Sequence, residues 1–543
     1  MYQKRSFLRP LTYLLLLLAL LWGGPAVVPA SSQAQSSGNA QAQASGEQQP
    51  AQTPQATPQQ SSSSGAAATD VPGAGVSVQN QPQGNDKSKS GDQPEEASRI
   101  TKQQAKELFR SVDEILQFAS NDTGLPIKRG VKRKLITRES VSKYISKRIN
   151  DDKDTQRLER SQLVLEKFGL LPPGYDLHKQ FLLLLGEQVA AYYEPKSRSV
   201  NMLDWVQPEI QKPVLAHELT HALQDQTVDL QKWPMAGEKD DKPLPDQQEE
   251  VVEEAQAARQ CVTEGQAMVV LFDYSLEPLD KNVVTAPEIV DAMRGQVAKS
   301  DDSPVFTAAP MFLRESLMMP YTFGLDFVRT VLANKGKEAA FAGMLQNPPV
   351  DTRQVMQPET YLLQQVVQPP TVPDLDRLVA PAYERFDFGA MGEFDVYLLA
   401  RQYGGADEPK KMYPHWRGGY YFAAHDKAAP KDQIAMLYFS RWDSPEVARK
   451  FRDLYASYLA KRYKWAKETS AEPATAVGAS AAADQEPSPA VRTFATDEGK
   501  VSLEVRGNDL LILEGFDDLV SDRARQVILY GMSLPSGGAK KQS

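Results

Sequence analysis

Apolar residues begin to recur at helical spacing just after residue 100. The positions on one predicted face are Ala105, Leu108, Phe109, Val112, Ile115 and Leu116. Spacings of three and four residues place side chains on the same side of an α-helix. Thr101 and Gln104 precede this face at the positions of a capping box, in which each side chain bonds the backbone N–H of the other residue. Folded structure is therefore predicted to start with a helix near Thr101.

A second long helix is predicted from about Asp246 to Phe272. Its small residues would let it pack closely against a neighbouring helix; they are Ala255, Ala257, Ala258 and Ala267. The acidic residues of its first turns are Glu249, Glu250, Glu253 and Glu254. Such a run is favourable near a helix N-terminus and is typical of a solvated face. We therefore expect these carboxylates to face water.

Two β-prone segments, Gly186–Glu194 and Ser199–Leu203, lie upstream of that helix. The residues between them, Pro195–Arg198, have the composition of a turn. The pattern predicts a β-hairpin.

The C-terminal part is set apart by a proline-rich segment, Pro369–Pro373, which predicts a domain boundary. The strands predicted beyond it are Gly419–Ala423, Ile434–Ser440, Val501–Val505 and Leu510–Glu514. One helix is predicted to begin at Ser444 and Pro445, and another to end near Tyr530. The resulting pair of β-β-α units would make one small domain.

The predicted fold class is α+β. Residues 99–368 are expected to form a mainly helical domain with a small sheet, and residues 369–535 an α+β accessory domain. Residues 31–98 are rich in Ser, Gln, Ala, Pro and Gly, so they are predicted to be a disordered tether. A similar composition predicts a flexible insert at 468–489, and residues 536–543 are expected to be a tail.

The N-terminus has the pattern of a secretory signal peptide. Basic residues precede a leucine-rich core, Leu14–Leu21, and small residues follow it at Val28–Ala30. We therefore predict that residues 1–30 are removed on export, which would make the protein periplasmic or secreted. If the segment is retained instead, Leu11–Val28 is long enough to anchor the chain in the membrane.

The formal net charge of −9 gives no support to a nucleic-acid partner. The one basic run, Lys128–Lys134, is interpreted as a solvated face. Cys261 is the only cysteine, so an intramolecular disulfide is excluded, and we expect it to be a buried small side chain. Nothing in the sequence indicates an oligomeric state.

The chemistry of the chain is concentrated in His217–His221, which reads His-Glu-Leu-Thr-His in a protein with five histidines. On a helix, residues four apart are neighbours, about 5–6 Å apart at Cβ. His217 and His221 can then bind one zinc ion, while Glu218 can reach a water on the metal without being a ligand. Pro213 is expected in the first turn of this helix. Apolar neighbours would make two buried histidines costly unless a metal binds them.

A catalytic zinc ion needs a third protein ligand and an open position. Thr227 stands where the metzincin pattern has a third histidine, so that class is excluded. The next histidine, His415, is far along the chain. Glu264 is the better candidate, because small and apolar residues surround it in the second predicted helix.

The sequence HELTHALQDQ at 217–226, with Glu-Gly-x-Ala at 264–267, resembles the gluzincin metallopeptidases. It is most similar to a group of exported bacterial proteins with this helix. The resemblance covers roughly Phe168–Tyr361, and its further matches are Ala190–Pro195, Pro320–Val328 and Pro348–Glu359.

The resemblance implies a zincin-like domain with one catalytic Zn2+ bound by His217, His221 and Glu264. It also implies that Glu218 acts as a general base on a zinc-activated water. The ligand spacing is longer than in thermolysin-like enzymes, and Gln231–Asp246 is interpreted as the loop that accounts for the difference.

Two more residues near the motif are candidates for supporting roles. Tyr321, after Pro320 in an aromatic stretch, is the first candidate for stabilising an oxyanion, and His415 and His425 are its rivals. Asp225 is expected either to orient the His221 imidazole or to end the helix. The predicted hairpin could bind a peptide by strand addition or serve as scaffold.

Together these features predict a zinc-dependent metallopeptidase that hydrolyses a peptide or protein substrate. The alternative is a non-catalytic envelope interaction protein, in which zinc only holds helices together. Substitution of Glu218 separates the two.

Overall fold

The computed structural model describes residues 99–141, 143, 152–187, 191–233, 245–297, 304–428, 433–472 and 491–534. The predicted signal peptide (1–30), tether (31–98) and tail (536–543) lie outside these residues, as does most of the predicted loop Gln231–Asp246. Along the described part of the chain, no helix combines the length and the hydropathy that a bilayer crossing requires.

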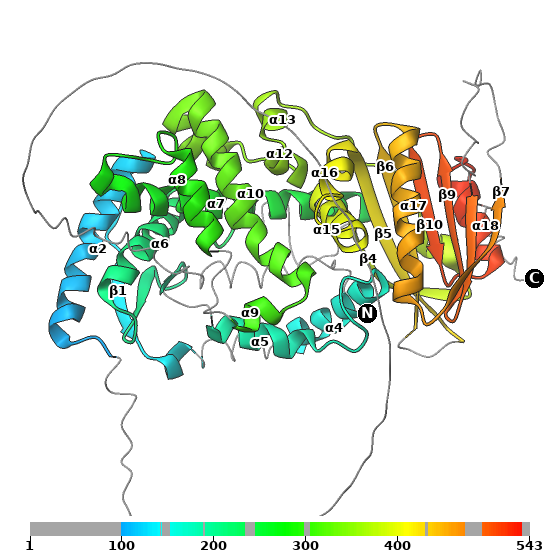
Figure 1. Ribbon diagram of the computed structural model, residues 1–543, viewed down its shortest axis with the longest axis horizontal. Helices are drawn as coiled ribbons and strands as arrows, with labels where there is room; N and C mark the ends of the chain where they lie inside the picture. Colours follow the sequence, from blue (N-terminus) through cyan, green and yellow to red (C-terminus); the bar gives the residue numbers. More distant parts are fainter. Residues whose placement is uncertain are drawn as a thin grey trace, which may run out of the picture. The chain divides into compact units, whose positions relative to one another are not determined.

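The fold is α+β, as predicted, with a helical part followed by a large sheet (Figure 1). Described helices before residue 380 are α2 (Lys102–Thr123), α4 (Asp152–Lys167), α5 (Leu177–Glu187), α6 (Pro208–Val228), α7 (Asp246–Leu276), α8 (Pro287–Val297), α9 (Pro304–Ala308), α10 (Met311–Glu338), α11 (Met344–Gln346), α12 (Thr352–Met356), α13 (Pro358–Leu362) and α14 (Leu375–Val379). A 3-10 helix, η3 (Glu277–Leu279), and a π-helix, η4 (Ala339–Gly343), follow α7 and α10.

Helix α2 begins as the sequence predicts. Thr101 Oγ1 accepts the Gln104 N–H at 3.2 Å, and Gln104 Oε1 accepts the Thr101 N–H at 2.8 Å, so the capping box is confirmed. The apolar face of α2 is buried in a core that it shares with α6 and α7. This packing supports the helix that carries the two histidines.

A small sheet lies beside α6. Its strands are β1 (Lys132–Ile136), β2 (Ala191–Glu194) and β3 (Ser199–Leu203), in the order β1-β3-β2. Strands β2 and β3 pair antiparallel, with Tyr193 opposite Val200, so the predicted hairpin is confirmed. Its first strand was predicted to start too early, because Gly186 and Glu187 belong to α5. Strand β1 is parallel to β3, and β2 therefore lies at an edge of the described sheet.

The basic run Lys128–Lys134 enters this sheet instead of forming a uniformly solvated face. Lys132 and Lys134 are exposed on β1, whereas the Arg133 guanidinium pairs with Asp113 at 2.7 Å. At the start of the run, the backbone N–H of Lys128 donates to Gln226 Oε1 at 2.8 Å. The run therefore also ties the strand to the end of α6.

Two expectations about helix starts were wrong. Helix α6 begins at Pro208, and Pro213 lies inside the helix, because Pro208 already occupies the first position, where a missing N–H costs nothing. In α7, Glu253 and Glu254 are buried, only 2% and 5% exposed, whereas the side chains of Glu249 and Glu250 lie outside the described part of the structure. Each carboxylate accepts a backbone N–H from another segment: Ala390 donates to Glu253 at 2.9 Å and Thr352 to Glu254 at 3.0 Å.

The C-terminal part contains one seven-stranded antiparallel sheet, in the order β4-β5-β6-β10-β9-β8-β7. Its strands are β4 (Tyr383–Ala390), β5 (Trp416–Asp426), β6 (Ile434–Trp442), β7 (Ala466–Glu472), β8 (Val491–Thr496), β9 (Gly499–Arg506) and β10 (Asp509–Glu514). The helices with it are α15 (Glu393–Gly404), α16 (Pro409–Met412), the 3-10 helix η5 (Tyr413–His415), α17 (Pro445–Arg462) and α18 (Asp518–Ile528). The two predicted β-β-α units are confirmed, and they join where β6 pairs with β10.

Both faces of this sheet are buried. Alternate residues point to opposite sides, so Tyr421 and Tyr438 belong to one core and Tyr420 and Leu437 to the other. Helices α15 and α17 cover the first face, and α14 and α18 cover the second. Strand β7 extends into the predicted insert 468–489, and the rest of that insert lies outside the described residues.

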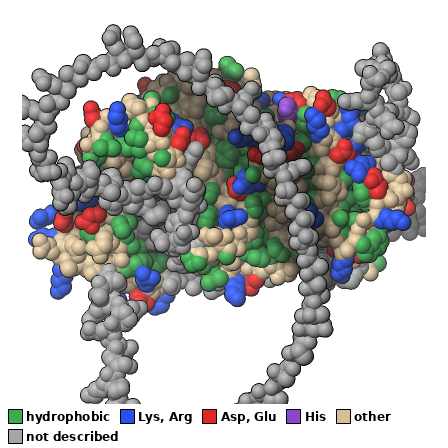
Figure 2. Space-filling view, in the orientation of Figure 1, with side chains coloured by type: hydrophobic (Ala, Val, Ile, Leu, Met, Phe, Trp, Pro, Cys, Tyr) green, Lys and Arg blue, Asp and Glu red, His purple; other side chains and the backbone are tan. Residues whose placement is uncertain are grey.

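Contacts cross the predicted boundary at Pro369–Pro373. The Arg385 guanidinium, in β4, donates to both oxygens of Asp246, at the start of α7, at 2.9 and 2.7 Å. Helix α7 thus contacts β4 as well as α6 and α10. On the face drawn in Figure 2, acidic and basic side chains are interspersed.

Candidate metal centre

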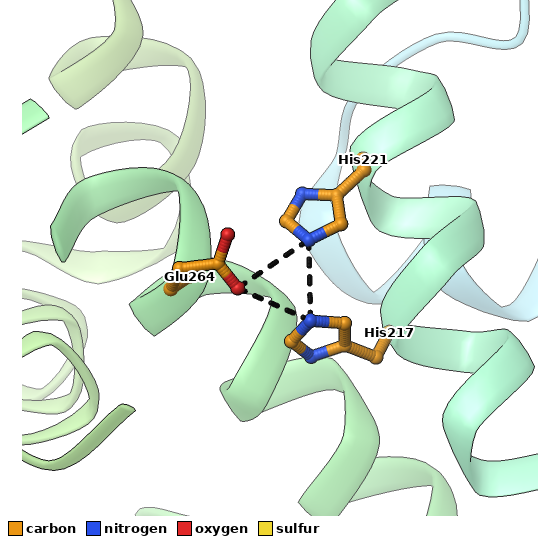
Figure 3. A group of neighbouring side chains, drawn as sticks. All are labelled: His217, His221 and Glu264. Atoms are coloured by element: carbon orange, nitrogen blue, oxygen red, sulfur yellow. Dashed lines mark hydrogen bonds and ion pairs between the residues drawn. The ribbon is translucent and has the colours of Figure 1, made fainter. Parts of the chain in front are cut away.

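Helices α6 and α7 bring together the three residues predicted to bind zinc. His217 and His221 are one turn apart on α6, and Glu264 reaches them from α7 (Figure 3). Their ligand atoms form a tight triangle. The two Nε2 atoms are 3.1 Å apart, and Glu264 Oε2 is 3.3 Å from His217 Nε2 and 3.5 Å from His221 Nε2.

This triangle fits a tetrahedral zinc ion. Ligand atoms about 2.0–2.1 Å from one zinc, at tetrahedral angles, are about 3.3 Å from each other. The measured separations of 3.1, 3.3 and 3.5 Å bracket that value. Two imidazoles and one carboxylate are also a donor set that zinc accepts. Among the described residues, this is the one group of His, Cys, Asp and Glu side chains close enough to share a metal ion.

Burial makes the charges of this group depend on one another. His217, His221 and Glu264 are each at most 2% exposed. Burial lowers the pKa of His217. Burial also acts against a charged His221, but the Glu264 carboxylate beside it raises the pKa of His221 to about 9. Although burial opposes it, the neighbouring histidines hold the pKa of Glu264 down, at about 2. Glu264 is therefore an anion that faces two ring nitrogens.

Glu218 is buried next to the triangle but is not part of it. Its Oε2 accepts the backbone N–H of Tyr193, in β2, at 2.7 Å. Burial raises the pKa of Glu218 to about 8, against the opposing effects of His221 and of the Tyr193 N–H. Its carboxyl group is thus fixed in place by the hairpin and has a raised affinity for a proton.

Tyr321 lies on α10, on another side of the same group. Its ring stacks near the His217 ring, with 6.3 Å between centroids and 26° between planes. Burial and the nearby carboxylates of Glu264 and Glu218 raise the pKa of Tyr321 well above its ordinary value. Its phenol group therefore stays protonated and can donate a hydrogen bond. The rivals lie elsewhere: His415 pairs with Asp443 at 2.7 Å, and His425 contacts the carbonyl of Gln433.

Asp225 does not orient His221. Its carboxylate accepts from Arg129 at 3.0 Å and from the Tyr193 hydroxyl at 2.9 Å, and it also accepts the N–H of Leu230, just after α6. The partner of His221 is Gln224, whose Oε1 lies 2.8 Å from His221 Nδ1.

Gln224 was missed because the sequence offers two polar residues at neighbouring helical positions. Both lie one turn after His221, and only the surroundings distinguish them. The signal available was the set of apolar residues around the two histidines, which predicts that polar side chains there are buried and need partners.

Cys261 is buried as expected, with its Sγ 3.1 Å from Met319 Sδ.

Comparisons with protein-family models, with curated proteins and with solved structures found no match for this chain. Support for a function therefore comes from the residues and geometry of the site.

Proposed function

We propose that this protein is a zinc-dependent metallopeptidase with a gluzincin-like site in a zincin-like domain. The observation that carries the proposal is the triangle of His217, His221 and Glu264, whose edges match a tetrahedral zinc site. Bound there, zinc would lower the pKa of a water toward about 7 and polarise a peptide carbonyl.

The side chains around the triangle fit the other parts of such a reaction. Glu218, which is buried beside the triangle and held by the Tyr193 N–H, would take a proton from the attacking water and return it to the leaving amine. Tyr321 would donate its hydroxyl hydrogen to the negative charge that develops on the carbonyl oxygen.

Strand β2 is the proposed binding edge for a peptide or protein substrate. Tyr193 pairs with Val200 of β3, but its N–H points to Glu218, so the edge of β2 that does not pair with β3 is directed toward the centre. A substrate strand added there would run past Glu218, with its register set by backbone hydrogen bonds.

The three-ligand set favours this proposal over a purely structural zinc site. Structural sites are closed by four protein ligands, whereas the described residues supply three at this centre, with an acid beside them. Action outside the cytoplasm, as a periplasmic or secreted enzyme, remains a prediction from the N-terminal sequence.

The test is Glu218→Gln. We expect this variant to bind one zinc ion and to fold like the wild type, but to lose peptide hydrolysis by about 10²–10⁴-fold, because the general base is gone. Zinc content is measured by elemental analysis, and hydrolysis with a broad peptide library.

The matched control is Glu209→Gln, the same change at an exposed residue of α6, which should leave both properties unchanged. Equal hydrolysis by wild type and Glu218→Gln would reject the catalytic role. A wild type that binds zinc but cleaves nothing in the library would favour the structural alternative.

A further inference from the structure

The hydrogen bond from His221 to Gln224 is the first of a continuous buried series. Gln224 Nε2 donates to the backbone carbonyl of Thr263 at 3.0 Å and to Gln266 Oε1 at 2.9 Å. Gln266 Nε2 in turn donates to the carbonyls of Ala340 and Phe341, at 2.8 and 3.0 Å. The series thus runs from the candidate metal ligand on α6, through α7, to the π-helix η4.

The ends of this series determine its direction. A backbone carbonyl can only accept, so the group of Gln266 that faces Ala340 and Phe341 has to be its NH2. Gln266 Oε1 is then the acceptor for Gln224, and the NH2 of Gln224 has to face Gln266 and Thr263. The one group of Gln224 left for His221 is its carbonyl oxygen, which requires a hydrogen on His221 Nδ1.

We propose that Gln224 and Gln266, the glutamine relay, hold His221 with a hydrogen on Nδ1, so that Nε2, which faces His217 and Glu264, is the nitrogen left to bind a metal. The π-helix carbonyls fix the orientation of the Gln266 amide and, through it, that of the Gln224 amide. The relay rests on the proposed metal site, which it deepens: Gln224 and Gln266 are positioning residues that act through His221 and touch no substrate.

The chemistry of the two amides supports a specific role. Both side chains are fully buried, and a buried amide is costly unless its groups are paired. Here each glutamine accepts one hydrogen bond and donates two. A metal-binding imidazole whose other nitrogen donates to a fixed acceptor has its ring orientation and its tautomer set.

The experiment compares zinc affinity and the His221 Nδ1–H signal in full-length protein. Zinc is titrated against a competing chelator, and the zinc-loaded protein with 15N-labelled histidine is examined by NMR for a slowly exchanging Nδ1–H. Gln224→Leu removes the acceptor. We expect zinc affinity to fall by about 10–100-fold and the protected Nδ1–H signal to be lost.

The matched control is Gln211→Leu. Gln211 is also on α6 and fully buried, and it bonds the backbone of Leu203 and Val206, with no link to a histidine. This change should alter stability while zinc affinity and the Nδ1–H signal stay as in the wild type. If Gln224→Leu does not fold, Gln266→Leu is tested in its place. This variant keeps the Gln224 acceptor but removes the hydrogen bonds to the π-helix carbonyls. We expect a smaller loss of zinc affinity and of the Nδ1–H signal.

The proposal is overturned by wild-type zinc affinity in Gln224→Leu, or by an equal loss in the Gln211→Leu control. A wild type that binds no zinc would overturn both the relay and the proposed function. If zinc binds and the variants behave as expected but no peptide is hydrolysed, the relay stands and the peptidase function falls.

Discussion

Two glutamates at the candidate metal centre have pKa values that their surroundings shift in opposite directions. Glu264 faces two ring nitrogens, which hold its pKa at about 2 in spite of burial. Glu218 is held by one backbone N–H in a buried place, and its pKa rises to about 8. An acid with a low pKa suits a ligand, and one with a raised pKa suits a base that has to keep a proton for part of the reaction.

Tyr321→Phe tests whether the phenol hydroxyl supports the reaction. We expect kcat to fall by about 10²–10³-fold, since one donor to a developing oxyanion is worth that much, while zinc content and KM change little. The control is Tyr361→Phe, a tyrosine whose hydroxyl donates to the Asn347 carbonyl. Steady-state kinetics on one cleaved peptide measures both. An unchanged kcat in Tyr321→Phe would show that another group stabilises the oxyanion.

At this scale the sequence predicts which three side chains come together better than it predicts their hydrogen-bond partners. His217 and His221 follow from helical spacing, and Glu264 from its small, apolar neighbours. Asp225 and Gln224 could not be distinguished, because the choice depends on groups from other segments. Arg129 and the Tyr193 hydroxyl donate hydrogen bonds to Asp225. Gln224 instead donates to two groups of α7, the carbonyl of Thr263 and the side chain of Gln266.

Among the elements, α7 and α10 approach each other at two glycines beside the centre. A Cβ on Gly265 would lie 2.2 Å from the carbonyl oxygen of Gly324, and a Cβ on Gly324 would lie 2.5 Å from that of Cys261. Neither backbone oxygen can move aside without shifting its helix. Gly265 follows the candidate ligand Glu264, and Gly324 lies one turn after Tyr321. The close contact therefore brings Tyr321 near α7, the helix that carries Glu264.

Gly324→Ala should force these helices apart. Helix propensity alone would favour alanine by about 1 kcal/mol, whereas overpacking of this kind costs about 1–3 kcal/mol. We expect a net loss in the free energy of unfolding in urea, together with weaker zinc binding in a chelator titration. Gly130→Ala is the control, because a Cβ there meets nothing within 4 Å. A Gly324→Ala protein as stable as the wild type, with unchanged zinc affinity, would contradict this packing.

Local sequence patterns predict helices and strands, whereas contacts between distant residues determine how these elements pair and pack. The hairpin β2–β3, the capping box of α2 and the two β-β-α units follow from neighbouring residues. Strands β1, β4, β7 and β8 were not predicted; β1 lies in a run interpreted as a solvated face, and β7 extends into the predicted flexible insert. The pairing of β6 with β10 joins residues about seventy positions apart, and alternation along a strand does not specify its partner.

For the whole molecule, the segment between α4 and α5 contacts the C-terminal sheet. The Phe168 ring packs edge-on against Tyr421 and Tyr438, at 6.0 and 5.7 Å between centroids. The backbone carbonyl of Phe168 accepts a hydrogen bond from the Tyr403 hydroxyl at 2.6 Å. Helix α5 follows this anchor and precedes β2, where Tyr193 holds Glu218. The C-terminal sheet thus packs against the segment that precedes α5 and, through β4, against α7, the helix that carries Glu264.

A buried carboxyl makes the junction between α7 and the C-terminal part sensitive to pH. Glu254 accepts the backbone N–H and the hydroxyl of Thr352, at 3.0 and 2.7 Å, and burial raises its pKa to about 8, with Asp395 adding to the effect. Burial likewise raises the pKa of Asp395 to about 7. The folded protein therefore binds protons that the unfolded chain releases near pH 4–5.

The sign of the linkage follows from the raised pKa of Glu254. Its contribution to stability is fully present below the unfolded pKa and is lost progressively as pH rises toward about 8, by at most about 1.4 kcal/mol per pH unit. Glu254→Gln replaces the acid with a neutral acceptor, so its free energy of unfolding should fall less than that of the wild type between pH 5 and pH 8. Urea unfolding at both pH values measures this difference, with Glu277→Gln, an exposed position at the end of α7, as control. Parallel curves for wild type and Glu254→Gln would mean that Glu254 is ionised in the folded protein throughout this range.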